Sequence, residues 1–140
     1  MNNSRRGIAQ IITLLLALNL FVLTSCSCWN SSFDVSATNS TGIVQAGQTI
    51  PPQTIMLFAP ATYGNGCPPA SNTVTSVDFY NGTNKLGTGT KGVNTFSFQW
   101  NITAGKDGIA ATGVSEVVLT AVDPSGYRSP IPFKFSVQAP

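Results

Sequence analysis

From Phe33 onward, apolar and polar residues alternate in short runs that are separated by turn-forming residues. Residues 96–100 (Phe-Ser-Phe-Gln-Trp) place three aromatic rings on one face, and residues 133–137 alternate in the same way. No window shows a sustained 3.6-residue period built from good helix formers. Because such alternation gives a strand one face for a core and one for solvent, the pattern predicts an all-β domain.

The turn residues divide this region into about seven expected strands. Asn81-Gly82 suits a tight hairpin, because glycine adopts positive φ without strain. Asp123 and Gly126 frame a second turn, in which proline presets φ. Trp100 ends an inward-facing run and is predicted to lie in the core. The approximate strand spans are 33–38, 53–60, 73–81, 84–90, 94–102, 114–123 and 131–138.

The N-terminus has the organisation of an export signal. Arg5 and Arg6 precede an apolar stretch, residues 8–23, of 16 residues. This stretch is shorter than the roughly 20 residues that a membrane-spanning helix needs. It ends in Leu23-Thr24-Ser25-Cys26, which resembles the lipobox of bacterial lipoproteins. The alternatives are an ordinary signal peptide near a structural cysteine, and an uncleaved anchor helix.

The lipoprotein resemblance implies cleavage of residues 1–25, a diacylglycerol on the Cys26 thiol and a further acyl chain such as palmitate on the new amine. Residues 26–32 would then form a tether, of which the seven steps to Phe33 span at most about 24 Å. The expected location is the bacterial cell envelope, with the membrane as a partner through the lipid. Ser27 after the cysteine resembles outer-membrane sorting, should the host be Gram-negative.

The other cysteines suggest a disulfide. The chain has three cysteines, so lipid on Cys26 leaves Cys28 and Cys67. Disulfides persist in exported proteins, and a Cys28–Cys67 bond is therefore a hypothesis. The alternative is that Cys28 is simply a small residue of the tether.

Roughly residues 50–138, within an expected domain of residues 33–140, resemble a bacterial immunoglobulin-like domain. The resemblance rests on five segments, namely Val77-Asp78-Phe79-Tyr80-Asn81-Gly82, Leu86-Gly87-Thr88, Phe96-Ser97-Phe98-Gln99-Trp100, Leu119-Thr120-Ala121-Val122-Asp123, and Gly126 with Ser129. It implies an antiparallel β-sandwich that serves as a spacer, an adhesion unit or a glycan binder. The chain departs from the pattern by an insert at residues 63–69 within an expected long loop, 61–72, and has a second long loop at 103–113.

Composition argues against several classes of function. Only 9% of the residues are charged, and the sequence has no histidine. Five basic residues balance five acidic ones beyond residue 25, so nucleic acid is not an expected partner. We expect a non-enzymatic protein with no catalytic residue, metal site or cofactor. Asp78 and Asp123 could in principle share a calcium ion, although Asp123 more simply caps its own turn.

Two functions remain for the domain. The first is a structural or protein-binding (adhesion) module that is held in the envelope by its lipid. The second is a surface-displayed carbohydrate-binding module, since aromatic side chains can stack on sugars. Tyr63 and Tyr127, which are predicted in loops, and Tyr80, on an outward strand face, are the candidate ligand contacts.

Overall fold

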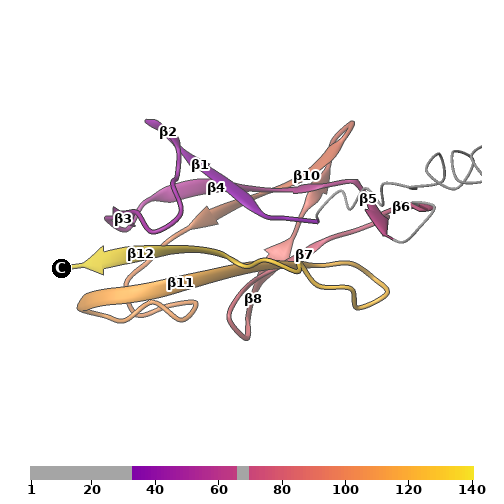
Figure 1. The fold of residues 1–140 in the computed structure, drawn as a ribbon. Coiled ribbons are helices and arrows are strands. Elements are labelled where there is room, and N and C mark those ends of the chain that lie inside the picture. Colours follow the sequence, from indigo (N-terminus) through magenta and orange to yellow (C-terminus); the bar gives the residue numbers. More distant parts are fainter. Residues whose placement is uncertain (1–32, 66–69) are drawn as a thin grey trace, which may run out of the picture.

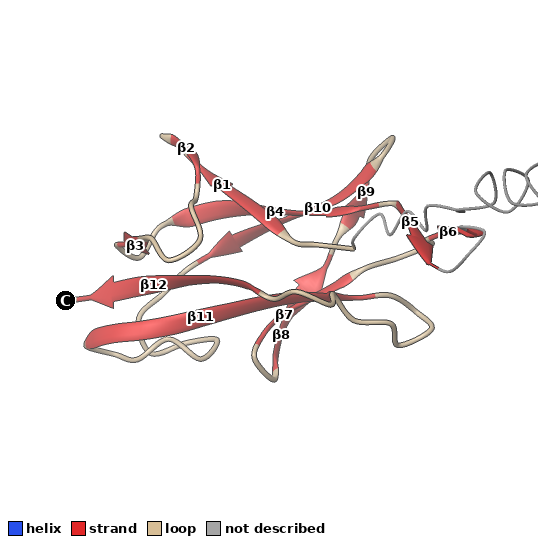
Figure 2. Ribbon diagram, viewed as in Figure 1, coloured by secondary structure: helices blue, strands red, loops and turns tan. Residues whose placement is uncertain are grey.

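A computed structural model describes residues 33–65 and 70–140, and this part of the chain contains strands and turns without a helix. Figure 1 labels the strands in chain order, except β9, which is labelled in Figure 2. Their bounds are β1 Ser36–Asn39, β2 Gly42–Ile43, β3 Thr49–Ile50, β4 Thr54–Pro60, β5 Thr62–Asn65, β6 Ala70–Thr73, β7 Asp78–Asn81, β8 Asn84–Thr88, β9 Thr90–Lys91, β10 Thr95–Asn101, β11 Gly113–Val122 and β12 Phe133–Ala139.

The long strands form two layers that face each other (Figure 2). Sheet A has the order β2-β1-β4-β10-β9, and sheet B has the order β3-β12-β11-β7-β8. The β5–β6 hairpin is a separate two-stranded sheet. All pairs are antiparallel except β3 with β12, which is parallel.

This strand order is that of an immunoglobulin-like sandwich, as the sequence predicts. In such domains the first, second, fifth and fourth main strands form one sheet, and the third, sixth and seventh form the other. Here β1, β4, β10 and β9 form the first set, while β7, β11 and β12 form the second with β8 added. The chain changes sheets between β2 and β3, so that β3 closes one edge of sheet B beside β12.

The core lies between the inner faces of the two sheets. Alternation along each strand directs every second side chain inward. Sheet A contributes Ile55, Leu57 and Trp100, and sheet B contributes Phe79 and Leu119, all at most 3% exposed. The prediction that Trp100 belongs to the core is confirmed. Each large side chain buried in this way stabilises the fold by roughly 1.5–3 kcal/mol.

The seven expected strands correspond to β1, β4, β7, β8, β10, β11 and β12. The span 73–81 was too long, because residues up to Thr73 pair with β5 instead of continuing into β7. The expected loop 61–72 likewise contains most of the β5–β6 hairpin. β12 begins at Phe133 and not at residue 131, since Pro130 and Pro132 lack the N–H groups that a ladder requires.

The β7–β8 hairpin is tight and is tied to a distant loop. Asn81 pairs with Asn84 across it, and Gly82 has a φ of 57°. The Asn81 side chain is buried, accepts a hydrogen bond from Val118 N at 2.9 Å and donates one to Asp107 O at 2.9 Å. Trp100 Nε1 donates to the Asp107 carboxylate at 3.1 Å. The 103–112 loop is therefore fixed by side chains from both sheets.

Replacing Asn81 with alanine should destabilise the domain by about 1–3 kcal/mol, because a part-buried N–H and a carbonyl both lose their partners. Urea unfolding followed by tryptophan fluorescence measures the change. Asn84→Ala is the matched control, since the Asn84 side chain is exposed and makes one long bond, of 3.4 Å. Equal losses in the two variants would contradict the role given to Asn81.

Candidate functional site

The outer face of sheet A is formed by the side chains that point away from the core on β1, β4, β9 and β10. Strand register aligns them in rows, so that Phe58 lies between Ser36 and Ser97, and Met56 lies between Thr38 and Gln99. On these four strands the set is Ser36, Thr38, Thr54, Met56, Phe58, Pro60, Thr90, Thr95, Ser97, Gln99 and Asn101, and Ile43 of β2 lies beside Thr38 on the same side. We call this set the sheet A face. Within the described part of the chain, no member of it carries a charge.

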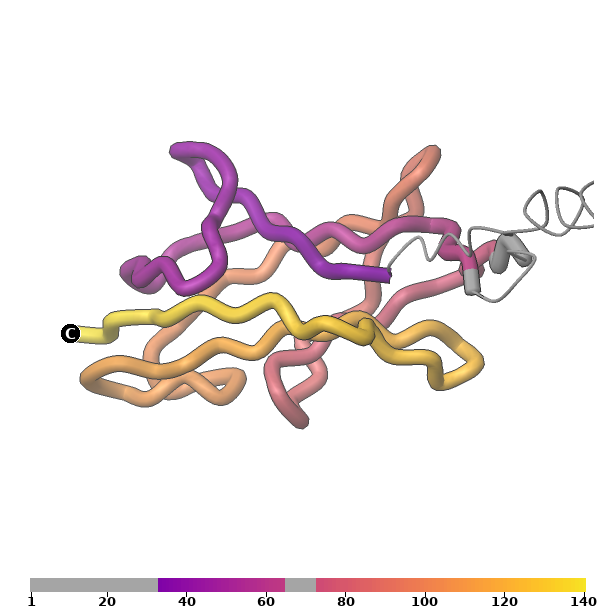
Figure 3. Tube along the Cα trace, in the orientation of Figure 1, coloured from indigo at the N-terminus to yellow at the C-terminus, as the bar shows by residue number. Residues whose placement is uncertain are grey.

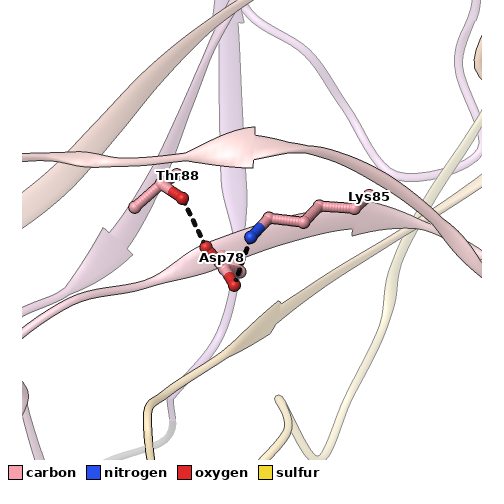
Figure 4. Close-up of polar contacts among 3 residues, drawn as sticks. All are labelled: Asp78, Lys85 and Thr88. Atoms are coloured by element: carbon pink, nitrogen blue, oxygen red, sulfur yellow. Dashed lines mark hydrogen bonds and ion pairs between the residues drawn. The ribbon is translucent and has the colours of Figure 1, made fainter.

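The opposite surface of the sandwich differs. On the outer side of sheet B, Lys85 Nζ lies 2.7 Å from Asp78, and Lys134 Nζ lies 3.5 Å from Glu116. Figure 4 shows the Asp78 carboxylate between Lys85 and Thr88, whose hydroxyl donates to it at 2.6 Å. The absence of charge from the sheet A face is thus a property of one surface, and not merely of a weakly charged chain.

Met56 and Phe58 lie at the centre of the sheet A face and are half-buried. The residues on either side of Phe58 in the sheet are the small polar Ser36 and Ser97. Beside Met56 lies an open hollow of about 340 Å³. Its lining residues are Thr38, Asn39, Ser40, Thr54, Ile55, Met56 and Gln99.

Sequence reasoning missed this pair, although a signal was present. Residues 55–60 (Ile-Met-Leu-Phe-Ala-Pro) are apolar throughout and do not alternate with polar residues. Only Ile55, Leu57 and Ala59 point into the core. Because successive side chains of a strand point to opposite faces, an unbroken apolar run of this kind predicts that the outer face of the strand is apolar as well.

Tyr63, a predicted ligand contact, is not the exposed loop residue that the sequence suggested. It lies on β5 and is only 6% exposed. Its ring stacks on Tyr127 with 4.6 Å between centroids and lies 5.2 Å from the Phe33 ring. Its hydroxyl donates to Asp123 at 2.9 Å. Burial, together with this hydrogen bond, raises the pKa of Tyr63. The sequence could not show these distant partners.

The other two candidate tyrosines are partly buried, and the three do not form one platform. Tyr127 lies in the β11–β12 turn with one ring face against Tyr63. Tyr80 lies on the outer side of sheet B, as its strand parity predicts, and the Arg128 guanidinium covers its ring at 5.3 Å. Ligand roles for Tyr80 and Tyr127 stay predictions. Because the two residues lie on different parts of the surface, each would belong to a site of its own.

The two aspartates of the calcium hypothesis are occupied by protein partners. Asp123 Oδ1 accepts from Ser125 N, Ser125 Oγ and Tyr127 N at 2.6–2.9 Å, so this residue caps its own turn. The Asp78 carboxylate is held by Lys85 and Thr88. Among residues 33–65 and 70–140, no cluster of three or more Asp, Glu, Cys or His side chains could hold a metal ion.

Hydrogen bonding governs the ionisation of both carboxyl groups. Bonds from Lys85 and then Thr88 lower the pKa of Asp78. Burial by itself would raise the pKa of Asp123, but hydrogen bonds from Ser125, Tyr63 and Tyr127 together outweigh it and hold the pKa below its usual value. Both groups therefore favour the ionised form in the folded state.

The predicted lipidation site Cys26 and the predicted Cys28–Cys67 disulfide lie outside the described residues and stay predictions. In the part that the structure describes, no helix is long and apolar enough to cross a membrane.

Comparison with known proteins adds no family to this description. No family model matches the chain, and no curated protein matches it. The function must therefore be argued from the surfaces of the sandwich and from its N-terminal sequence.

The stability of the domain should fall in acid. A carboxyl group with a lowered folded-state pKa stabilises the fold above its unfolded pKa, which is about 3.9 for aspartate. That contribution is lost as the pH falls through the folded-state value. Asp123→Asn keeps an acceptor oxygen but cannot titrate, so its urea midpoint should fall less steeply below about pH 4. Parallel acid curves for the variant and the native protein would refute this assignment.

Proposed function

We propose that this chain is a non-enzymatic, lipid-anchored protein of the bacterial cell envelope, whose immunoglobulin-like domain serves as a structural or protein-binding module. The lipobox-like sequence Leu23-Thr24-Ser25-Cys26 supports the anchor. Two or more acyl chains hold a protein on a membrane stably, whereas one holds it only marginally. In a Gram-negative host the expected location is the outer membrane.

The uncharged sheet A face is the observation that carries the binding role. Cores of protein interfaces are depleted in charged residues and enriched in methionine and aromatic side chains. Met56 and Phe58 at the centre, with serine, threonine, asparagine and glutamine around them, fit that composition. A charged partner surface would lose solvation here without gaining an ion pair, so the face selects a neutral partner.

The size of the face indicates a modest contact. β4 and β10 each have seven residues, which corresponds to a length of about 24 Å. With the four residues of β1 and the two of β9, a rise of about 3.4 Å per residue and a strand spacing of about 4.8 Å give the face a flat area of roughly 330 Å². A standard interface buries about 800 Å² per partner, so this face fits a transient partner or one that also touches the flanking turns.

A carbohydrate ligand is the alternative, and the surroundings of Phe58 favour considering it. The half-buried Phe58 ring could stack on a sugar, while neighbouring hydroxyl and amide groups offer hydrogen bonds. Affinity electrophoresis through polysaccharide gels separates the two functions. Retardation that is lost in Phe58→Ala would favour the glycan, whereas no retardation across a broad panel would remove it.

Metabolic labelling with an alkyne fatty acid tests the anchor. The wild-type protein should incorporate the label, and Cys26→Ala should incorporate none, because the acceptor thiol is gone. Cys28→Ala is the matched control and should label like the wild type. An unlabelled wild-type protein would overturn the lipoprotein assignment.

Photo-crosslinking in cells tests the binding face. A photoreactive amino acid in place of Phe58 should give a discrete crosslinked product, whereas the same group in place of Val118, on the outer side of sheet B, should not. Adding Met56→Lys should reduce the product about ten-fold or more, because burying an unpaired ammonium costs more than 1.4 kcal/mol. Equal products from the two positions would argue against the sheet A face.

A further inference from the structure

The described chain enters and leaves the sandwich at opposite ends. Phe33, the first described residue, lies 5.2 Å from the Tyr63 ring and 6.1 Å from the Tyr127 ring. These rings belong to the β5–β6 hairpin and the β11–β12 turn. Ala61 N donates to Asn94 O at 2.9 Å, which brings the β9–β10 turn to the same end. Figures 1 and 3 show these segments together, with the C-terminus at the other end.

We name the end formed by β5, the β9–β10 turn and the β11–β12 turn the anchor end. It presents an apolar side chain that has no packing role within the domain. Val93 is 93% exposed at the tip of the β9–β10 turn. The turn is closed by Gly92 N donating to Thr95 O at 2.7 Å, so Val93 is held outward on an ordered support. Lys91, also exposed, lies two residues before it.

A second exposed apolar side chain lies close to the point of entry. Ile131 is 66% exposed and lines an open groove together with Asp34, the residue after Phe33. By contrast, Val114 is 63% exposed at the start of β11, where Gly113 pairs with Ala139 beside the C-terminus. Val114 is therefore an exposed valine at the opposite end of the sandwich and can serve as a control for Val93.

We propose that the anchor end rests on the lipid surface, with Val93 at the boundary between head groups and acyl chains. This inference rests on the proposed lipidation of Cys26. The seven residue steps from Cys26 to Phe33 span at most about 24 Å, so the anchor end cannot leave the neighbourhood of the membrane. β11, with ten residues, extends about 34 Å along the sandwich and places Val114 away from the membrane.

The chemistry of the β9–β10 turn suits this occupant. A valine tip can bury its methyl groups, and the exposed Lys91 two residues before it can place its ammonium among lipid phosphates. The lipid supplies the affinity, and the turn sets the orientation. The turns of the anchor end are then covered by membrane, whereas the sheet A face lies along the side of the sandwich and stays open to a partner.

The test uses the purified, lipidated protein in vesicles of phosphatidylethanolamine and phosphatidylglycerol. An environment-sensitive fluorescent amino acid replaces Val93 in one sample and Val114 in another. The probe at position 93 should shift to the blue on vesicle binding and be quenched several-fold more by head-group-labelled lipid than the probe at position 114. Circular dichroism confirms that both variants fold.

Equal responses at the two positions in protein that carries the lipid would overturn the proposed orientation and leave the anchor intact. Protein whose intact mass shows no lipid, and which does not bind the vesicles, would overturn the anchor and this inference together. The two failures are therefore distinguishable in one preparation.

Discussion

The packing of two alternating sheets against each other is the interaction on which the rest of this domain depends. Trp100, Ile55 and Leu57 meet Phe79 and Leu119 across the sandwich and are almost wholly removed from water. Since one face of each strand packs into this core, only the other face can differ in charge between the two surfaces. Sheet B uses its outer face for ion pairs, and sheet A leaves its own uncharged.

Polar contacts then fix the connections that the core does not reach. At one end, Asp123 joins its own turn to the β5–β6 hairpin through Tyr63, and the aromatic rings of Tyr127 and Phe33 complete the cluster. At the other, Asn81 and Trp100 hold the 103–112 loop through Asp107. A sandwich whose two ends are both ordered can present a defined end to a membrane and a defined side to a partner.

Sequence predicted the strands with one buried face well, because β10, β11 and β12 alternate clearly and β11 ends at the Asp123 turn. It did worse where a contact is long-range. Tyr63 lies among glycine, asparagine and proline residues, and its burial depends on Phe33 and Tyr127, which are far away in sequence. Residues 55–60 also indicate an apolar outer face for β4. The alternation drew attention to the core-facing residues of this run, and the outward-facing Met56 and Phe58 were missed.

The proposed protein combines an N-terminal export signal with a folded domain, and its mature form would begin at a lipid-bearing Cys26. Intact mass spectrometry of the protein extracted from membranes by detergent measures this most directly. The expected mass is that of the chain from Cys26 onward, increased by a diacylglycerol group, with or without a further acyl chain. A mass that corresponds to the uncleaved chain, or to a chain cut elsewhere and carrying no lipid, would contradict it.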